Sequence, residues 1–537
     1  MLRWLLTIPL IFLASCQKES QVDRATREGV LLVGNANEPK GLDPHIVSGV
    51  LEANILRALF EGLIGNDPQS DTATPGGAAL QVTPDATATV WTAKLRPDGK
   101  WSDGVTVTAQ DFAFSYQRIL TPELGAKYSE MLYFLKGAED FNKGKTKDFS
   151  TVGVEVVDDE TLRLTLRGPT PYFREILKHY TWTAVPRHVV LKHGKIGQRG
   201  NPWTRPENLV SNGPYQLKSW RRNDHIEVER NPHYWNAAKV TLNGVRFLPV
   251  SNLYTEARMF RDGQLHMTYA ATPEVVDLMK KENPAALRQE PYVGTVFYRF
   301  NTTRKPLDDP RVRQALSMAI DREAIKRNIM RGLSIPAGLM VAPGVNGNTP
   351  DIDVPIKTDS EGAKKLLAEA GYPDGFEVRM NCPNNRYVND EEICQAVIAM
   401  WARIGVKIQL VAENMATFSQ KFQNFDSSLY LLGWGVATYD AQYMIQSLVR
   451  TRTSGADGNF NFSRISDPTV DRLTDAMKSE VDVAKRNAMI KEALLRIKDE
   501  VLVIPIHHQM RPWAMKAGVS TVHRSDDRPE ARFTSMR

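Results

Sequence analysis

Cysteine is scarce in this chain of 537 residues, which contains three. Two of them, Cys382 and Cys394, lie in the body of the chain without histidines at ligand spacing, so the sequence gives no metal site. In an oxidising compartment this pair predicts a disulfide, and otherwise it is two small buried thiols. The sequence alone leaves both alternatives open.

An excess of one charge sign is also missing. The chain has 68 Lys and Arg against 62 Asp and Glu, a formal net charge of +6, and 42% hydrophobic residues. No cluster of Lys and Arg marks a nucleic-acid partner, and the composition excludes a disordered chain. At about 150 residues per domain, the length predicts about three to four domains with room for an interdomain cleft.

Long apolar runs are absent after the first twenty residues. Arg3 precedes the apolar residues 4–13, a run typical of a signal peptide and too short for a membrane span of about 20 residues. The run ends in Leu13-Ala14-Ser15-Cys16, which resembles the lipidation motif of bacterial lipoproteins; an ordinary secretory signal cut at a nearby small residue is the alternative. We expect a signal peptide at 1–15, lipidation at Cys16, a polar tether over 16–28, and membrane contact through the lipid only.

Catalytic motifs are missing as well. Gly144-Lys145-Thr146 has the end of a phosphate-binding loop, but Glu139 stands where its first glycine is required. There is no G-x-S-x-G, no H-E-x-x-H and no Gly-rich dinucleotide motif. His507 and His508 lie in an expected strand and point to opposite faces, so they cannot grip one metal together. We expect no cofactor, although a catalytic triad assembled in space is not excluded.

The first half of the chain shows the period of antiparallel strands. Residues 152–157 and 161–166 alternate apolar and polar around Asp158-Asp159-Glu160, which predicts a hairpin with one buried face. Residues 215–217 and 226–229 indicate a second pair of strands.

The second half alternates strands with helices from about residue 293. Asp309-Pro310 opens a helix with an N-cap acid and a first-turn proline, and Asn389 with Glu392 suggests a capping box. The alternation predicts an α/β lobe. Its expected strands are 295–300, 376–382, 406–411, 428–434 and 501–506, and further helices are expected at 360–370, 468–478 and 484–498.

Glycines flank an aromatic residue at Gly433-Trp434-Gly435, where a strand is expected to end. Two glycines let another backbone approach closely, and the indole provides a flat wall, which suggests a binding segment. A core Trp beside a tight turn is the alternative.

Several segments together resemble the extracytoplasmic solute-binding proteins of peptide-type ABC importers. The segments are residues 91–112, 211–215, 229–235 and 309–322. Trp101-Ser102-Asp103-Gly104 and the segment 49–54 are most similar to the oligopeptide-binding branch. The resemblance runs in order along nearly the whole chain after Cys16.

This resemblance implies an α/β periplasmic-binding-protein fold of the class with an inserted domain, in which two lobes close about a hinge on a ligand in the interlobe cleft. The implied first lobe is discontinuous and comprises 29–60, 186–293 and 506–537. The inserted subdomain would be 61–185, and the second lobe 294–505. The last boundary agrees with the change of rhythm near residue 293.

The resemblance also implies a function: a monomeric receptor in the periplasm or cell envelope that captures a peptide or peptide-like solute. It would deliver the solute to the transmembrane permease subunits of an ABC importer, which are driven by separate ATPase subunits. Peptides of varied sequence can be held by pairing their backbones with exposed strands. The residues implied to bind ligand are Val47, Ser48, Gly49, Val50, Tyr128, Met131, Gly433, Trp434, Gly435, Tyr439 and Asp440.

The sequence departs from the family where an acid normally receives the peptide's α-ammonium, because that position is Ala437. The basic residue of oligopeptide receptors, two positions before the first glycine, is Leu431. Since a buried ammonium needs a counter-charge, Asp440 is a candidate replacement; its alternative role is the N-cap of a helix over 441–449. A receptor for a dipeptide, nickel chelate, haem or opine-like conjugate, an extracytoplasmic hydrolase, and a non-transporting sensor or chaperone remain the rival functions.

Overall fold

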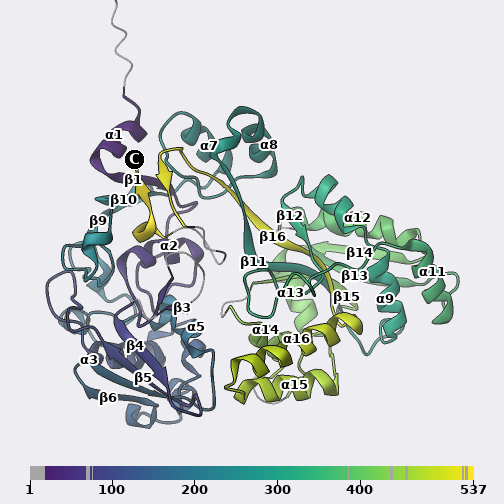
Figure 1. The fold of residues 1–537 in the computed structure, drawn as a ribbon, viewed down its shortest axis with the longest axis horizontal. Coiled ribbons are helices and arrows are strands. Elements are labelled where there is room, and N and C mark those ends of the chain that lie inside the picture. The colour runs from purple at the N-terminus through teal and green to yellow at the C-terminus, as the bar shows by residue number, and fades with distance from the viewer. Residues whose placement is uncertain are drawn as a thin grey trace, which may run out of the picture.

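The fold has two lobes joined by two long neighbouring strands (Figure 1). The computed structural model describes residues 19–67, 73–74, 77–384, 386–435, 439–453, 457–522, 525 and 530–537. The joining strands are β11 (Leu287–Phe300) and β16 (Ile504–Ala514). The predicted two-lobed α/β architecture is confirmed.

The first lobe contains a four-stranded sheet in the order β1-β10-β9-β8. β1 and β10 are parallel, and the other neighbours are antiparallel. The expected pair of strands at 215–217 and 226–229 is therefore present, with longer bounds. The elements are β1 (Val30–Gly34), α2 (Val50–Leu59), α6 (Arg187–His193), β8 (Tyr215–Arg221), β9 (His225–Arg230), β10 (Gly244–Leu248), α7 (Leu253–Arg261) and α8 (Pro273–Glu282).

Between α2 and α6 the chain forms a second sheet, in the order β4-β5-β7-β6, and all of its neighbouring strands are antiparallel. Its β6–β7 hairpin confirms the alternating pattern around residues 158–160. Trp91 of β5, Trp101 and Trp182 are buried in the same apolar core. The elements are β2 (Gly65–Asn66), β3 (Ala73–Thr74), β4 (Ala79–Pro84), β5 (Val90–Leu95), α3 (Ala109–Leu120), α4 (Ala138–Asn142), β6 (Val154–Asp158), β7 (Thr161–Thr165) and α5 (Phe173–Leu177).

The second lobe is built on a mixed sheet in the order β12-β16-β11-β15-β13-β14. One apolar core joins the sheet to α9, α11 and α12, and another joins it to α13–α16, so helices cover both faces. The elements are α9 (Pro310–Met318), α10 (Arg322–Ala324), β12 (Ser334–Pro336), α11 (Ser360–Glu369), β13 (Glu377–Pro383), α12 (Asp390–Ala402), β14 (Lys407–Glu413), α13 (Met415–Gln423), β15 (Leu429–Gly435), α14 (Ala441–Leu448), α15 (Pro468–Ser479) and α16 (Val483–Asp499).

Two local predictions near α9 and α12 have different outcomes. The Asp309 carboxylate accepts the N–H of Arg311, as an N-cap acid should. The capping box at Asn389 is wrong: Asn389 makes no side-chain cap bond, has φ 55°, and donates its side-chain amide to the carbonyl of Ile329 instead.

The lobe boundaries expected at residues 294 and 506 fall inside the joining strands. β11 and β16 pair from Leu287 to Pro291 and again from Thr295 to Tyr298, with the register interrupted between. Both strands run through the second lobe's sheet, while Leu287 and Ala514 at their other ends pack in the apolar cluster of α7 and α8 of the first lobe. Each strand therefore belongs to the two lobes in turn. The strand expected at 501–506 accordingly begins later and extends farther.

The tether expected over 16–28 is wrong for its described part. Residues 21–28 form α1 (Gln21–Glu28), which Ser20 caps by accepting the N–H of Asp23. Ala25 is buried against the first lobe, and the Val22 N–H donates to the carbonyl of Gly263. At the other end of the chain, β17 (Val519–Ser520) and β18 (Ser535–Met536) pair, and Met515 bridges to Met267 of the first lobe.

Candidate binding cleft

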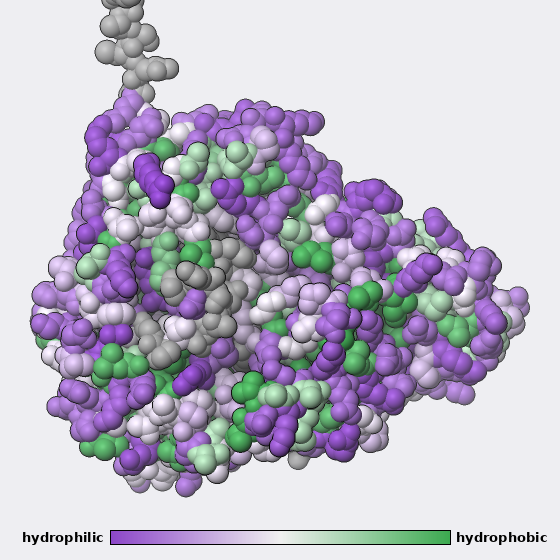
Figure 2. Space-filling view, in the orientation of Figure 1, coloured by the Kyte–Doolittle hydropathy of each residue, from purple (hydrophilic) through white to green (hydrophobic). Residues whose placement is uncertain are grey.

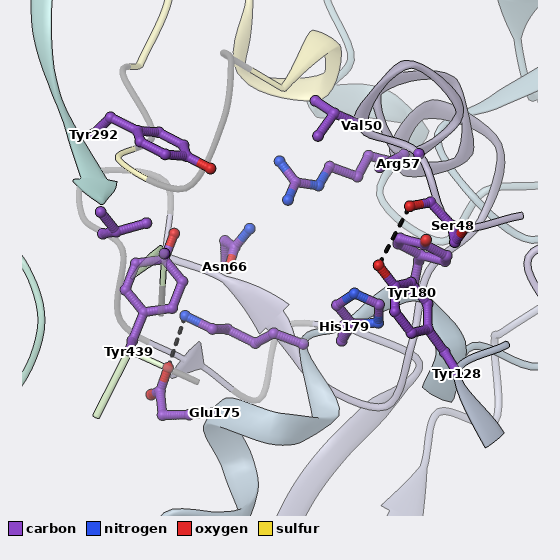
Figure 3. A pocket seen from close by; sticks show the side chains of 15 residues that line it. Ser48, Val50, Arg57, Asn66, Tyr128, Glu175, His179, Tyr180, Tyr292 and Tyr439 are labelled. Carbon is purple, nitrogen blue, oxygen red and sulfur yellow. Dashed lines mark hydrogen bonds and ion pairs between the residues drawn. The ribbon is translucent and has the colours of Figure 1, made fainter. Parts of the chain in front are cut away.

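A cavity of about 230 Å³ lies between the lobes. Figure 3 shows the side chains around it: Val50 and Arg57 come from α2, and Tyr292 and Tyr439 stand opposite. The molecular face in Figure 2 is mostly hydrophilic, with apolar residues scattered over it. Because both lobes contribute to its lining, this cavity is the candidate ligand site.

The first lobe's wall is the loop that leads into α2. Ser48, Gly49 and Val50 line the cavity, as expected. Val47 is buried behind them, where its carbonyl accepts the Tyr180 hydroxyl at 3.2 Å. The Tyr128 hydroxyl donates to the Ser48 carbonyl at 3.3 Å. Hydrogen bonds from two tyrosines therefore hold the backbone of this loop in place.

Both tyrosines, Tyr180 and Tyr128, remain protonated in the cleft. Burial is the main cause that raises the pKa of Tyr180, and the nearby Tyr128 and Glu52 raise it further. Burial is also the main cause that raises the pKa of Tyr128, and the nearby Glu130 raises it further. Both hydroxyls therefore stay hydrogen-bond donors at neutral pH.

A charged pair forms the floor between the lobes. The Lys178 ammonium lies 2.7 Å from the Glu175 carboxylate, which Figure 3 marks with a dashed line. The same ammonium lies 4.1 Å from the centre of the Tyr439 ring, which belongs to the second lobe. A cation over an aromatic face is favourable, so the pair links the lobes at the base of the cleft.

The second lobe contributes Gly435, Tyr439, Tyr292 and Val293 to the cavity. Gly433 and Trp434 belong to β15, as Gly435 does, but they do not line the cavity. Trp434 packs against Phe460, with ring centres 5.0 Å apart. Gly433 lies under the Tyr387 ring, where an added Cβ would come within 2.6 Å of Tyr387.

Met131 and Asp440 also lie outside the cavity lining. Met131 is half-buried against the first lobe's core and accepts the Thr181 hydroxyl at 3.7 Å. The two residues thus differ from the placement that the family resemblance implied.

Asp440 has the alternative role, that of a helix N-cap. Its carboxylate accepts the N–H of Gln442 at the start of α14. Two hydrogen bonds of 2.7 Å from the Arg486 guanidinium satisfy its charge. The expectation that Asp440 receives a ligand ammonium is corrected, because its counter-charge is already inside the second lobe. Ala437 lies outside the described residues, and Leu431 is fully buried in β15.

Sequence reasoning missed the charged lining residues Arg57, Glu175 and Lys178. For Arg57 a signal existed, because Val50, Ala53 and Arg57 follow the i, i+3, i+7 spacing of one helix face. Glu175 lies in the short helix α5 and Lys178 is its C-cap, and the place of this helix at the cleft depends on the tertiary fold.

Two other sequence features have structural roles. The structure joins Cys382 and Cys394 in a disulfide. His508 is buried and lies 2.8 Å from the Asp353 carboxylate, while the neighbouring His507 hydrogen-bonds to the His508 carbonyl. Within the described ranges, no three His, Cys, Asp or Glu residues are placed to hold a metal ion. The described helices include none long and apolar enough to cross a membrane.

Comparison with known proteins gives a consistent result. The family model of bacterial extracellular solute-binding proteins, family 5, matches residues 73–456. The periplasmic oligopeptide-binding protein OppA of Escherichia coli is 34% identical over 496 residues, covering 90% of this chain and 88% of the relative.

Two solved structures share the fold at different similarity. The unliganded open form of the murein tripeptide-binding protein MppA has a TM-score of 0.85 at 28% identity, covering 95% of this chain and 97% of that one. The Haemophilus influenzae OppA complex with the peptide RPPGFSPFR has a TM-score of 0.70 at 27% identity, covering 95% and 99%. The whole-chain TM-score is therefore higher for the open form than for the peptide complex.

Proposed function

The chain belongs to family 5 of the bacterial extracellular solute-binding proteins, which bind solutes and are not enzymes, and from this premise we propose that it is the peptide receptor of an ABC importer. It captures oligopeptides in the periplasm and delivers them to transmembrane permease subunits, which separate ATPase subunits drive. Relatives named for oligopeptide binding support the solute class.

The observation that carries this proposal is the meeting of two chain segments at one cavity. Ser48 and Gly49 on the first lobe and Gly435 on the second line the same space between the lobes. These are the two segments that the family resemblance assigns to backbone pairing. A ligand held by its backbone between two walls can have varied side chains.

Capture would proceed by closure about β11 and β16. The interrupted register between Pro291 and Thr295 is a place where the two strands can bend. Similarity to an open form supports an unliganded state with separated lobes. Small-angle scattering should give a smaller radius of gyration with a binding peptide; an unchanged profile at saturation would contradict closure.

The solute class is tested by identifying small molecules that copurify with the protein, using mass spectrometry, and then by calorimetry with the same peptides. Gly435→Val should abolish binding, because its side chain would enter the cleft while the added Cβ meets no atom closer than 3.6 Å. Gly168→Val is the matched control, since nothing lies within 4 Å of that Cβ. The proposal would be refuted if the copurifying molecules were not peptides and no peptide gave a heat of binding.

The finer features are a lipid anchor at Cys16 and a monomeric state. Cys16 lies outside the described residues, and in the sequence it precedes α1 by five positions. A lipid there would hold the first lobe close to the membrane surface. Sedimentation analysis of the protein without its lipid tests the monomer.

A further inference from the structure

The two lobes also touch at a place away from the joining strands. Tyr172, the N-cap of α5, packs against the first lobe's core, and Gln442 lies in the first turn of α14 in the second lobe. The Gln442 side-chain amide donates to the Tyr172 hydroxyl at 3.3 Å. In Figure 1, α5 and α14 accordingly lie next to each other below β11 and β16. This contact is a second attachment between the lobes.

The second lobe's side of this contact is preformed. The Arg486 guanidinium of α16 lies over the Tyr172 ring, 5.0 Å from its centre, and its charge is already balanced by two hydrogen bonds to Asp440. Arg486 also donates to the Gln442 side-chain oxygen at 2.9 Å, which leaves the amide nitrogen to face Tyr172. Burial is the main cause that raises the pKa of Tyr172 to about 12, so its hydroxyl stays protonated at neutral pH.

The cavity touches both attachments. Its lining includes Tyr292 of β11 and also Glu175 and Lys178, which follow Tyr172 along α5. In Figure 3, Tyr292 stands above and the ion pair of Glu175 with Lys178 lies below. The Lys178 ammonium, 4.1 Å from the centre of the Tyr439 ring, is a second cation–aromatic contact that crosses between the lobes at this end.

Two separated attachments limit how the lobes can move. Two bodies that stay joined at two places can rotate only about the line through them, as a door turns on two hinges. The strands permit this rotation at their interrupted register. The cation–aromatic contacts permit it as well, because the attraction acts wherever the cation stays over the ring within about 6 Å of its centre. The half-exposed pairs of Arg331 with Glu274 and Asp277 of α8 add little.

We propose that the contact of Tyr172 with Gln442 and Arg486 is a second pivot of the receptor, which is kept in both the open and the closed state. Capture then turns the lobes about the line from this pivot to β11 and β16. The inference rests on the proposed peptide-binding function and deepens it. Tyr172 does not line the cavity and acts as a positioning residue. It restricts the unliganded lobes to one rotation, so a ligand has less motion to restrict when it binds.

The first test joins the two sides of the pivot covalently. Tyr172→Cys and Gln442→Cys are combined with Cys16→Ala, and a short bismaleimide links the two new thiols, since Cys382 and Cys394 form a disulfide. With trialanine and with the copurifying peptides, the linked protein should keep its affinity within threefold of the unlinked one. Small-angle scattering should show the same decrease in radius of gyration. A link that prevents this decrease would show that closure moves the two sides apart, which refutes the pivot.

The second test removes the pivot. Tyr172→Ala should weaken peptide binding at least tenfold in calorimetry and should increase the radius of gyration of the unliganded protein. Tyr172→Phe keeps the ring beneath Arg486 and should stay within threefold of the wild type. Tyr133→Ala is the matched control, because Tyr133 also packs against the first lobe's core, and its hydroxyl donates to Asn142 of the same lobe at 2.7 Å. This control should bind peptide like the wild type.

The outcomes separate the pivot from the function on which it rests. If Tyr172→Ala keeps both the affinity and the radius of gyration of the wild type, the pivot is refuted while peptide binding stands. An equal loss of affinity in Tyr133→Ala would trace the effect to a loosened first lobe and would also refute the pivot. If no peptide binds the wild type, the proposed function fails and the pivot fails with it.

Discussion

Asp440→Asn should destabilise the second lobe strongly. The Asp440 and Arg486 side chains are 4% and 6% exposed, and the guanidinium donates to both carboxylate oxygens. Asparagine can still accept the Gln442 N–H and cap α14, so the substitution isolates the loss of charge. It leaves Arg486 buried without its counter-charge.

The expected cost follows from the burial of the pair. Removing one partner of a buried ion pair costs about 3–5 kcal/mol. For a lobe of about 200 residues, this lowers its melting temperature by on the order of 10 °C. Adding Arg486→Met should recover most of the loss, because no uncompensated charge then remains.

Differential scanning calorimetry measures this effect, and Asp475→Asn is the control. Asp475 pairs with Arg450 at 3.0 Å but is half exposed, so its loss should cost at most about 1 kcal/mol. If Asp440→Asn melts like the wild type and instead loses peptide affinity, the carboxylate serves the ligand and the structural role is refuted.

Three further predictions concern pH, the disulfide and the anchor. Burial lowers the pKa of His45 and of His507 to about 4 each, so below pH 6.5 the unfolded chain binds more protons than the folded one. The free energy of unfolding should therefore fall between pH 6.5 and 4 by about 3 kcal/mol per histidine. His507→Gln should lessen this loss in melting curves. Cys394→Ser should cost about 3 kcal/mol by the loop-entropy relation for a separation of 12 residues, and a reductant that leaves wild-type melting unchanged would contradict this. Cys16→Ala should abolish incorporation of labelled palmitate, and continued labelling would exclude Cys16 as the anchor.

Local elements were predictable where the chain itself supplies the determinants. Asp309-Pro310 contains both the cap and the first-turn proline of α9, so its start needed no tertiary information. The β6–β7 hairpin likewise follows from alternation around a polar turn. In both cases, interactions within about ten residues decide the structure.

Other features depend on distant partners. The polar sequence of α1 offers only Val22 and Ala25 as buried positions, and its packing partners include first-lobe residues more than 200 positions later, such as Ala257 and Phe260. Asn389 had the sequence of a cap, but the carbonyl of Ile329 takes its side chain. In the site, Gly433-Trp434-Gly435 was suggested by its own residues and the segment 47–50 by family resemblance. Glu175 and Lys178, in contrast, reach the cleft only through the tertiary fold.

The position of β16 has a consequence for biosynthesis. This strand lies inside the second lobe's sheet, between β12 and β11, although it follows all the helices of that lobe in the chain. A nascent chain that ends before residue 504 therefore has a sheet with an open gap and an exposed β11 edge. The second lobe cannot complete its fold as it leaves the ribosome, and the unfinished chain should remain a substrate for chaperones until residues 504–514 have been made.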